Sequence, residues 1–213
     1  MEQYLDSYGE LPEIIGRIDI DVSEAEMCFV QYLPVLIPNQ RGALPENLQW
    51  VDPILMRVLG DLISSGVSGV GKYIYLTVKR LYGSGNREGW HCDGFGTDDI
   101  NYIWYDSHPT KFYAGDLIKL PKHHRNSILK MSEVLYKTNK LVEYPCKTLI
   151  RMNQSSIHRV NPEVFTGLRT FVKISFSDSK YNLKGNAHNH SLDYNWEMVE
   201  RGADRNHPIG DKL

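Results

Sequence analysis

A series of short segments with strand character, preceded by one long helical stripe, is the sequence feature that most constrains the fold. Between residues 72 and 177, aromatic and β-branched residues gather in segments that turn residues separate. These segments are KYIYLTVKRLY (72–82), NYIWYD (101–106), KFYAGDLIKL (111–120), KTLIRM (147–152) and LRTFVKISFS (168–177). Many short strands after a helix are typical of an antiparallel sandwich or barrel. The sequence therefore predicts a mainly β fold with flanking helices.

One helix is predicted ahead of these strands. Asp52 is a residue type that caps helix N-termini, and Pro53 suits the first turn. Apolar residues then recur with helical spacing until Ser64-Ser65-Gly66 ends the pattern. The stripe consists of Val51, Ile54, Leu55, Val58, Leu59, Leu62 and Ile63. Because all of these residues are aliphatic, we expect a scaffold helix packed on a flat surface.

Three further segments complete the expected organisation. CFVQYLPVLIP (28–38) predicts one or two strands, and NSILKMSEVLYKTNK (126–140) favours a short helix. The polar tail, residues 178–213, is expected to wrap the body or to stay partly mobile. With no repeat or low-complexity linker, we expect one domain over 1–213, with a core at about 72–177 preceded by N-terminal strands and the scaffold helix.

Composition narrows the class of protein. Hydrophobic residues make up 41% and charged residues 23% of the 213 residues, as in soluble globular chains. The net charge of −2 shows no basic excess of the kind that nucleic-acid binding favours. Cys28, Cys92 and Cys146 are widely spaced, which fits a reducing compartment. Since neither a signal-peptide pattern nor a long apolar run is present, we expect a cytoplasmic enzyme or binding protein without membrane association.

The segment EGWHCDGFG (88–96) carries the strongest chemical signal. His91 and Asp93 are two residues apart, so on an extended backbone their side chains project from the same face. An ordinary polar turn would also account for a bare H-x-D. His158, in QSSIHRVNP, is the best-placed third ligand because it follows a predicted strand directly. Two imidazoles and one carboxylate form the facial triad of non-haem Fe(II) sites, which leaves coordination positions open.

An arginine follows the second histidine at a suggestive distance. Ten residues separate Arg169 from His158, and a hairpin turn through NPEVFTG would return the chain beside the histidine. A guanidinium binds a carboxylate through two parallel hydrogen bonds. Arg169 could therefore hold the distal carboxylate of an oxo-acid that chelates the metal at its other end.

In these four residues the sequence resembles the 2-oxoglutarate- and Fe(II)-dependent dioxygenases. The resemblance covers roughly residues 72–177 and is closest in IHRVNPEVFTGLRTFVKISFS. It implies a double-stranded β-helix, the jelly-roll or cupin-like fold. His91, Asp93 and His158 match the iron ligands, and Arg169 matches the residue that binds the C5 carboxylate of 2-oxoglutarate. The resemblance further implies O₂ as co-reactant and hydroxylation of a C–H bond with release of succinate and CO₂.

Two positions depart from the pattern of the family. Phe171 stands where many members carry a serine or threonine as a second carboxylate partner, so another strand must supply that hydrogen bond. We place Tyr102 first for this role, ahead of Tyr105, Tyr75 and Thr77. Ser175 stands where AlkB-type repair enzymes carry a second arginine, which speaks against that subgroup.

Four residues near the predicted site are candidates for substrate contact: Arg87, Trp90, Trp104 and Asp106. Arg87 lies in the loop before the ligands, where a solvated loop is the simpler interpretation. Trp90 adjoins His91 and would line either the pocket or the core. Strand alternation points Cys92 away from the metal. His188-x-His190 could form a second metal clip, but the polar tail offers no third ligand.

Three functional classes remain open. The first is a hydroxylase whose substrate is a protein side chain, a small metabolite or a nucleobase; nucleic acid is not favoured, because acidic residues intersperse with the basic ones. The second is a cupin-type metal-binding jelly roll without oxygenase activity, and the third is a catalytically silent interaction domain. Arg169 discriminates, since a cupin that uses no oxo-acid needs no guanidinium at that spacing. The oligomeric state is not encoded in any motif.

Overall fold

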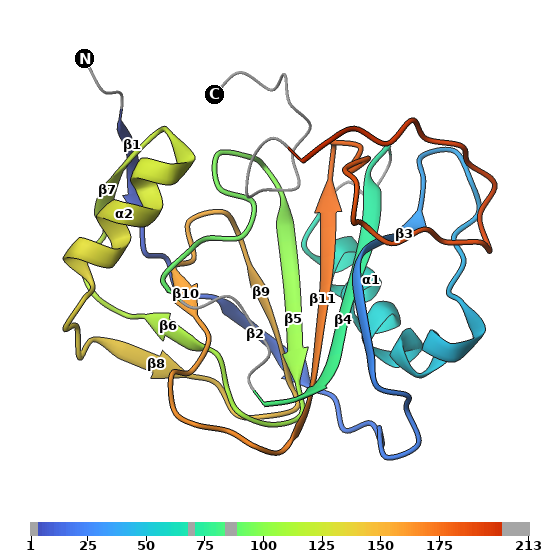
Figure 1. Cartoon of the computed structure of the whole chain (residues 1–213), viewed down its shortest axis with the longest axis horizontal. Helices are drawn as coiled ribbons and strands as arrows, with labels where there is room; N and C mark the ends of the chain where they lie inside the picture. The colour runs from blue at the N-terminus through green and yellow to red at the C-terminus, as the bar shows by residue number, and fades with distance from the viewer. Residues whose placement is uncertain (1–3, 68–70, 84–88, 202–213) are drawn as a thin grey trace.

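The largest layer of the structure is a six-stranded antiparallel sheet with the order β2-β9-β5-β11-β4-β3 (Figure 1). The computed structural model describes residues 4–67, 71–83 and 89–201. The strands of this sheet are β2 (Glu13–Arg17), β3 (Cys28–Leu36), β4 (Tyr73–Tyr82), β5 (Ile100–Tyr105), β9 (Thr148–Met152) and β11 (Leu168–Ser177).

Two smaller antiparallel sheets and two helices surround the large sheet. A three-stranded sheet has the order β10-β6-β8, and a two-stranded sheet pairs β1 with β7. Their strands are β6 (Lys111–Tyr113), β8 (Leu141–Glu143), β10 (His158–Arg159), β1 (Tyr4–Tyr8) and β7 (Ile118–Pro121). The 3₁₀ helix η1 (Glu46–Val51) leads into α1 (Asp52–Ser64), and α2 (His124–Val134) follows β7.

Strand β11 is central to the large sheet. It pairs with β4 along its whole length, from Leu168 opposite Tyr82 to Ser177 opposite Tyr73, and with β5 on its other side. Its β-branched and aromatic residues suit an extended strand that is buried on both faces. Because successive side chains point to opposite faces, one strand supplies both an apolar face and a polar face.

The apolar face of the large sheet packs against α1. The helix buries Ile54, Val58 and Leu62, which recur at intervals of four residues and so form one stripe. The even-numbered residues Val172 and Ile174 of β11 belong to the same core cluster. A second cluster, which includes Phe112, Tyr144 and Ile150, fills the space between the large sheet and the three-stranded sheet. A third cluster lies beneath α2.

The fold is therefore mainly antiparallel β with two flanking helices, of the jelly-roll, cupin-like class, as the strand pattern predicts. Figure 1 shows α1 behind the large sheet and α2 at the opposite side of the molecule, next to β1 and β7. The predicted strands at 28–38, 72–82, 101–106, 147–152 and 168–177 are all present with small changes of boundary. Within the described residues, neither helix has the length and apolar character needed to cross a membrane.

Several local predictions are wrong in detail. Asp52 is not the N-cap of α1, because η1 runs directly into the helix and Val51 occupies the cap position. The segment 111–120 forms two strands, β6 and β7, which pair in different sheets. A Cβ at Gly115 would collide with the Tyr113 ring, so the chain turns there at a residue without a side chain. Strands β1, β2, β8 and β10 were not predicted individually.

The tail beyond β11 wraps the body over its described part, residues 178–201. The Ala187 N–H donates to the Gln31 carbonyl over 2.8 Å, and Asn189 Nδ2 donates to the Pro34 carbonyl over 2.8 Å. Both acceptors belong to β3, so the tail is fastened along the edge of the large sheet (Figure 1). Residues 202–213 lie outside the described part.

We expect the Ile54→Ala variant to lose about 2–5 kcal/mol of unfolding free energy, because its side chain is 1% exposed and truncation leaves a cavity beneath α1. Ile63→Ala is the matched control, since Ile63 on the same helix is 80% exposed and should cost less than about 0.5 kcal/mol. Urea unfolding of the three proteins measures both values. Equal losses would contradict the placement of the α1 stripe on the sheet.

Candidate metal centre

Two histidines that are far apart in the sequence are joined directly through their backbones. The His91 N–H donates to the His158 carbonyl and the His158 N–H donates to the His91 carbonyl, both over 2.9 Å. This isolated antiparallel bridge places His91 beside β10, and the centroids of the two imidazole rings lie 4.4 Å apart. His158 is held from its other side by pairing with Phe112 of β6.

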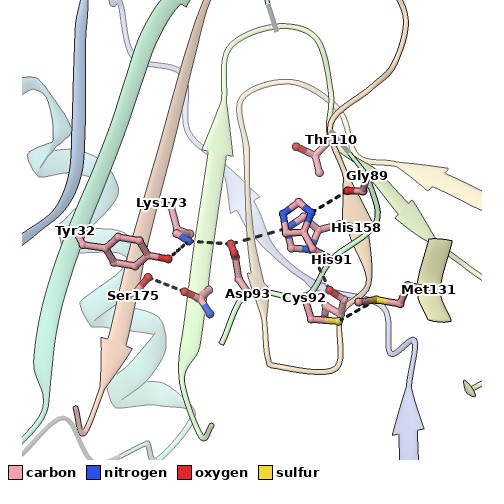
Figure 2. A network of polar contacts seen from close by, with 12 residues as sticks. Tyr32, Gly89, His91, Cys92, Asp93, Thr110, Met131, His158, Lys173 and Ser175 are labelled. Atoms are coloured by element: carbon pink, nitrogen blue, oxygen red, sulfur yellow. Dashed lines mark hydrogen bonds and ion pairs between the residues drawn. The ribbon is translucent and has the colours of Figure 1, made fainter. Parts of the chain in front are cut away.

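Asp93 completes a cluster of three metal-ligand side chains. Its Oδ2 lies 3.8 Å from His158 Nε2, and one ligand atom from each of His91, Asp93 and His158 lies within 4.8 Å of the others (Figure 2). A tight turn follows Asp93: Gly94 has φ of +68°, and a Cβ there would lie 2.9 Å from the Asp99 side chain. The turn needs glycine, and it keeps the carboxylate aimed at the histidines.

Both imidazoles make their backbone hydrogen bonds through the same ring nitrogen, Nδ1. His91 Nδ1 lies 3.0 Å from the Gly89 carbonyl, and His158 Nδ1 lies 3.0 Å from the Ser156 carbonyl. A carbonyl only accepts, so each Nδ1 carries the proton and each Nε2 presents a lone pair in the neutral ring. Burial lowers the pKa of His158 and so favours this neutral form, although Asp93 opposes the shift. Metal-binding histidines use this arrangement.

A lysine that the sequence analysis did not consider shares the carboxylate. Lys173 Nζ of β11 lies 2.9 Å from Asp93 Oδ2 and donates to the Tyr32 hydroxyl over 2.9 Å (Figure 2). Burial disfavours the charge of Asp93, but the attraction of Lys173, His158 and His91 outweighs it and holds the pKa well below its usual range. Asp93 is therefore an anion at neutral pH and can ligate a cation.

The donor set fits a divalent transition metal. Two neutral imidazoles and one carboxylate are the ligands of the facial triad, which suits Fe(II) and related ions. Within the described residues, no other group of three histidine, cysteine or acidic side chains comes together in this way. His188 and His190 lie side by side, with ring centroids 4.7 Å apart, but they gain no third ligand.

The odd-numbered face of β11 carries the cations that adjoin this centre. Arg169 and Lys173 are four residues apart on one strand and so share a face, and Lys79 of β4 lies opposite Phe171 on the same face. Burial and the neighbouring charge of Lys173 lower the pKa of Lys79 to about 8. Lys173 and Lys79 thus place positive charge near the Asp93 carboxylate, and Arg169 lies further along the same face of the sheet.

Arg169 is buried, with 4% of its surface exposed. Its Nε donates to the Ser107 and His108 carbonyls over 3.1 and 3.0 Å, and its Nη2 lies 3.4 Å from Thr110 Oγ1. The guanidinium carbon lies 5.2 Å from the centroid of the Phe171 ring. Thr110 is itself buried, with 4% of its surface exposed, and Figure 2 shows it in the same view as the imidazole pair.

Asn101 of β5 is a second residue that sequence reasoning missed. Its Oδ1 accepts a hydrogen bond from Ser175 Oγ over 2.6 Å, whereas its buried Nδ2 has no partner among the described residues. A Cβ on Gly94 would lie 3.5 Å from this Nδ2, which places the amide beside the turn that follows Asp93. A buried donor without a partner is costly, and a bound ligand with an acceptor oxygen would satisfy it.

Tyr102 does not face this site, so its predicted role as a carboxylate partner is wrong. It lies on the α1 side of the large sheet, where its hydroxyl donates to Asp61 Oδ2 over 2.7 Å. Trp104 shares that face and donates from Nε1 to the Ile18 carbonyl over 3.0 Å, so it cannot contact a substrate at the metal centre. Strand alternation instead directs Tyr105 inward, 5.7 Å from the Arg169 guanidinium carbon.

The remaining predicted residues have other surroundings. Trp90 is 3% exposed, belongs to the cluster beneath α2 and lies under the Arg159 guanidinium, so it lines the core. Asp106 Oδ1 accepts the Thr170 N–H and the Ser107 hydroxyl, which fixes the end of β5. Cys92 is buried near Met131 and points away from the ligands, as alternation predicts. Arg87 lies outside the described residues.

A cavity of about 670 Å³ lies along the two segments that carry the ligands. The stretch 96–100 follows Asp93 and the stretch 153–155 precedes His158, and both line the cavity. Its other polar lining residues include Glu10 and Lys122. The cavity thus has both polar and apolar lining, and it borders the chain after Asp93 and before His158.

Comparison with known proteins adds two distant structures. No protein-family model matches the chain, and no curated protein matches it in sequence. The crystal structure of EvdMO1 aligns with 13% identity and a TM-score of 0.43 over 80% of this chain. The structure of EvdO2 from Micromonospora carbonacea var. aurantiaca complexed with 2-oxoglutarate aligns with 15% identity and a TM-score of 0.33, over 70% of this chain and 76% of that one. The chain spans about half of EvdMO1 (47%).

We expect the Lys173→Met variant to be less stable without metal and to gain more from metal. Removing the ammonium leaves the Asp93 carboxylate in a buried site without its partner, which costs on the order of 3–5 kcal/mol. A divalent cation would replace the lost charge, so Co²⁺ should raise the melting temperature of the variant more than that of the wild type. Differential scanning calorimetry of metal-free protein, with and without Co²⁺, measures both effects.

Lys130→Met is the matched control, because Lys130 pairs with Glu133 on the exposed surface of α2 and such pairs contribute little. If the Lys173 variant had the same melting temperature as the wild type, and Co²⁺ raised both equally, the ion pair between Lys173 and Asp93 would not stabilise the carboxylate in the metal-free protein.

Proposed function

We propose that this protein is an Fe(II)- and 2-oxoglutarate-dependent oxygenase that hydroxylates a C–H bond, with O₂ as co-reactant and succinate and CO₂ as coproducts. The observation that carries the proposal is the convergence of His91, Asp93 and His158 on one spot, with both imidazoles held through Nδ1. The jelly-roll fold is the one that the sequence resemblance implies, and the basic residues on one face of β11 support an acidic cosubstrate.

The residues of the chain have distinct roles in this proposal. The three ligands would hold the iron through two Nε2 atoms and a carboxylate oxygen. The buried Arg169 guanidinium would receive the distal carboxylate of 2-oxoglutarate, since a guanidinium is the preferred partner of a carboxylate. Lys173 and Lys79 add positive potential for a dianion, and Asn101 Nδ2 offers a donor for an oxygen atom at the metal end. When bound, iron and 2-oxoglutarate supply the oxidising chemistry.

The surroundings of the ligands also serve the chemistry. The His158 ring lies 5.5 Å from the Phe112 ring, and Phe112 belongs to the buried cluster between the sheets. This apolar backing limits water on the inner side of the centre, which strengthens the electrostatic interactions there. The cavity of about 670 Å³ lies next to the segments that carry the ligands, and its polar residues would suit a substrate that carries hydrogen-bonding groups.

Succinate release tests the proposal directly. The metal-loaded wild type with 2-oxoglutarate, ascorbate and O₂ is incubated separately with pools of peptides, nucleic acids and small metabolites. We expect succinate above the background in one pool and none with Asp93→Ala, which lacks the carboxylate ligand.

One observation favours a second candidate, a metal-binding jelly roll of cupin type without oxygenase activity. Lys173 already compensates the charge of Asp93, so the cluster is electrostatically satisfied without a reacting cosubstrate. This candidate predicts that the wild type binds a divalent cation but neither binds 2-oxoglutarate nor forms succinate with any pool.

We expect Arg169→Gln to weaken 2-oxoglutarate binding by about 2 kcal/mol or more, roughly 30-fold, because a charged hydrogen-bonding partner is lost in a buried site. Anaerobic titration of the Fe(II) protein, followed by the charge-transfer absorption of the iron–oxo-acid complex, measures the affinity. Arg159→Gln is the matched control, because that guanidinium stacks on Trp90 away from the centre. Unchanged affinity in the Arg169 variant would refute its assignment.

The affinity for 2-oxoglutarate should fall as the pH rises from about 7 to about 9. The pKa of Lys79 is lowered to about 8, so its ammonium attracts a dianion below that pH and is neutral above it. In the ligand-free protein the free energy of unfolding has the opposite pH dependence. The pKa of Lys79 is lower in the folded protein than in the unfolded one, so stability increases as the pH rises through about 8. Titrations at several pH values compare the wild type with Lys79→Gln, which should lose this part of the pH dependence. An identical slope in both proteins would contradict the role of Lys79.

A further inference from the structure

A continuous series of aromatic rings leads from the metal centre to the surface. Tyr32, whose hydroxyl contacts Lys173, packs edge-on against Tyr181 with ring centroids 5.3 Å apart. Tyr181 stacks on Tyr75 at 4.4 Å and an interplanar angle of 10°, and Tyr75 stacks on Tyr73 at 5.9 Å.

The series ends in the wrapped tail. Tyr73 packs edge-on against Trp196 with ring centroids 5.9 Å apart, and the ring centroids of Trp196 and Tyr194 lie 4.6 Å apart. The inner rings of Tyr181 and Tyr75 are 3% and 0% exposed, whereas Tyr73 and Trp196 are half-buried. The rings therefore run from the dry interior to a position that solvent can reach.

One tyrosine in the series, Tyr181, donates its hydroxyl proton to a carboxylate, which can accept that proton. The Tyr181 hydroxyl donates a hydrogen bond to Asp99 Oδ2, and both residues are buried. Ordinary core packing does not explain a carboxylate at this place, because burying one is costly. Removing an electron from a phenol makes its proton strongly acidic, so a hydrogen-bonded carboxylate makes this ring easier to oxidise than a tyrosine that donates to a carbonyl. Tyr75 is such a tyrosine, since it donates to the Ser179 carbonyl.

Neighbouring charges set the order in which the rings lose electrons. Lys173 Nζ lies 4.7 Å from the Tyr32 ring centroid, and this cation disfavours a positive charge on that ring. Lys180 Nζ lies 5.9 Å from the Trp196 ring and acts in the same direction at the outer end. Tyr181, beside a carboxylate, is the most readily oxidised position between them.

We propose that Tyr181 and Asp99 form a redox-active pair, and that the rings from Tyr32 to Trp196 carry electrons to the metal centre when it is oxidised without a substrate to react with. This role rests on the proposed oxygenase function, whose O₂ chemistry supplies the one-electron oxidant. A protein that makes such an oxidant in its interior is protected if the oxidising equivalent reaches the surface instead of damaging the ligands.

The electrons and protons balance in two steps. Tyr181 gives one electron through Tyr32 to the oxidised metal centre and its phenolic proton to Asp99 Oδ2, so Tyr181 is oxidised to a neutral radical and the centre is reduced by one electron. A soluble one-electron reductant of the ascorbate class then gives one electron at Trp196, and this electron reaches Tyr181 across Tyr73 and Tyr75 while the proton moves back from Asp99 to the Tyr181 oxygen. Tyr181 is thereby restored, and the reductant is oxidised by one electron.

Photo-oxidation of the iron-free, full-length protein tests the pair without the oxygenase reaction. Flash photolysis with ruthenium tris-bipyridine and persulfate generates a one-electron oxidant in solution, and electron paramagnetic resonance of the frozen sample detects tyrosyl radicals. We expect a persistent tyrosyl signal in the wild type that is lost in Tyr181→Phe. It should also be lost in Asp99→Asn, which keeps the shape of the acceptor but cannot take the proton.

Tyr144→Phe is the matched control, because Tyr144 is also buried and donates to the Pro12 carbonyl in a different cluster. Its radical yield should equal that of the wild type. A signal that survives unchanged in Tyr181→Phe or in Asp99→Asn would overturn the proposal.

A measurement on the wild type alone covers the case in which a variant fails to fold. Photo-oxidation in the presence of a nitroso spin trap, followed by peptide mass spectrometry, should place adducts on the peptides of Tyr181 and Trp196. Adducts confined to other tyrosines would refute the relay. Because this chemistry needs neither iron nor 2-oxoglutarate, its failure leaves the oxygenase proposal standing. Failure of the protein to bind 2-oxoglutarate would refute the oxygenase proposal. The tyrosyl radical signal of the iron-free protein would still decide whether Tyr181 and Asp99 form a redox-active pair.

The iron-loaded protein gives a readout of protection. With 2-oxoglutarate and O₂ but no substrate, Tyr181→Phe should accumulate more covalent oxidation than the wild type on the peptides that carry Tyr32 and Lys173, as measured by mass spectrometry. Equal oxidation in the two proteins would show that the rings do not protect the site.

Discussion

The reciprocal backbone bridge between His91 and His158 is the constraint on which the candidate site depends. Two hydrogen bonds of 2.9 Å hold together segments between which strands β5 to β9 lie in the sequence, and they fix both rings on the same side. The turn at Gly94 then brings Asp93 back toward the rings. A site built on paired strands is held more rigidly than one built on loops alone, which suits a centre that must keep its ligands in place.

Electrostatics explains how such a cluster can exist in a buried place before any ligand arrives. Asp93 would be costly to bury alone, but Lys173 lies within hydrogen-bond distance and is itself held by Tyr32. The same lysine shares a strand face with Arg169, so one strand supplies both the partner of the carboxylate ligand and the buried guanidinium. The polar face of β11 thus carries both the cation that stabilises the Asp93 carboxylate and a second, buried cation.

Much of the fold and the ligand triad could be predicted from the sequence, because strand character and the i, i+2 spacing of His91 and Asp93 are local properties. The face on which Tyr102 lies could not. Strand β5 is buried on both sides, so its hydropathy does not distinguish the helix-facing residues from Asn101 and Tyr105. Lys173 did leave a signal, a lone cation within a hydrophobic strand at an even spacing from Arg169. Its pairing with Asp93 depends on tertiary structure and could not be predicted from this signal.

The wrapped segment 178–201 has a consequence for the order in which the protein is assembled. Tyr181 packs against Tyr32 and Tyr75, and Ala187 and Asn189 are fastened to β3, which is made much earlier during synthesis. The paired strands β9, β5, β11 and β4 all precede this segment in the chain and can pair without it, but the surroundings of Tyr32 cannot form. The chain therefore completes the surroundings of Tyr32, which holds Lys173 beside Asp93, only after the segment 178–201 has been synthesised.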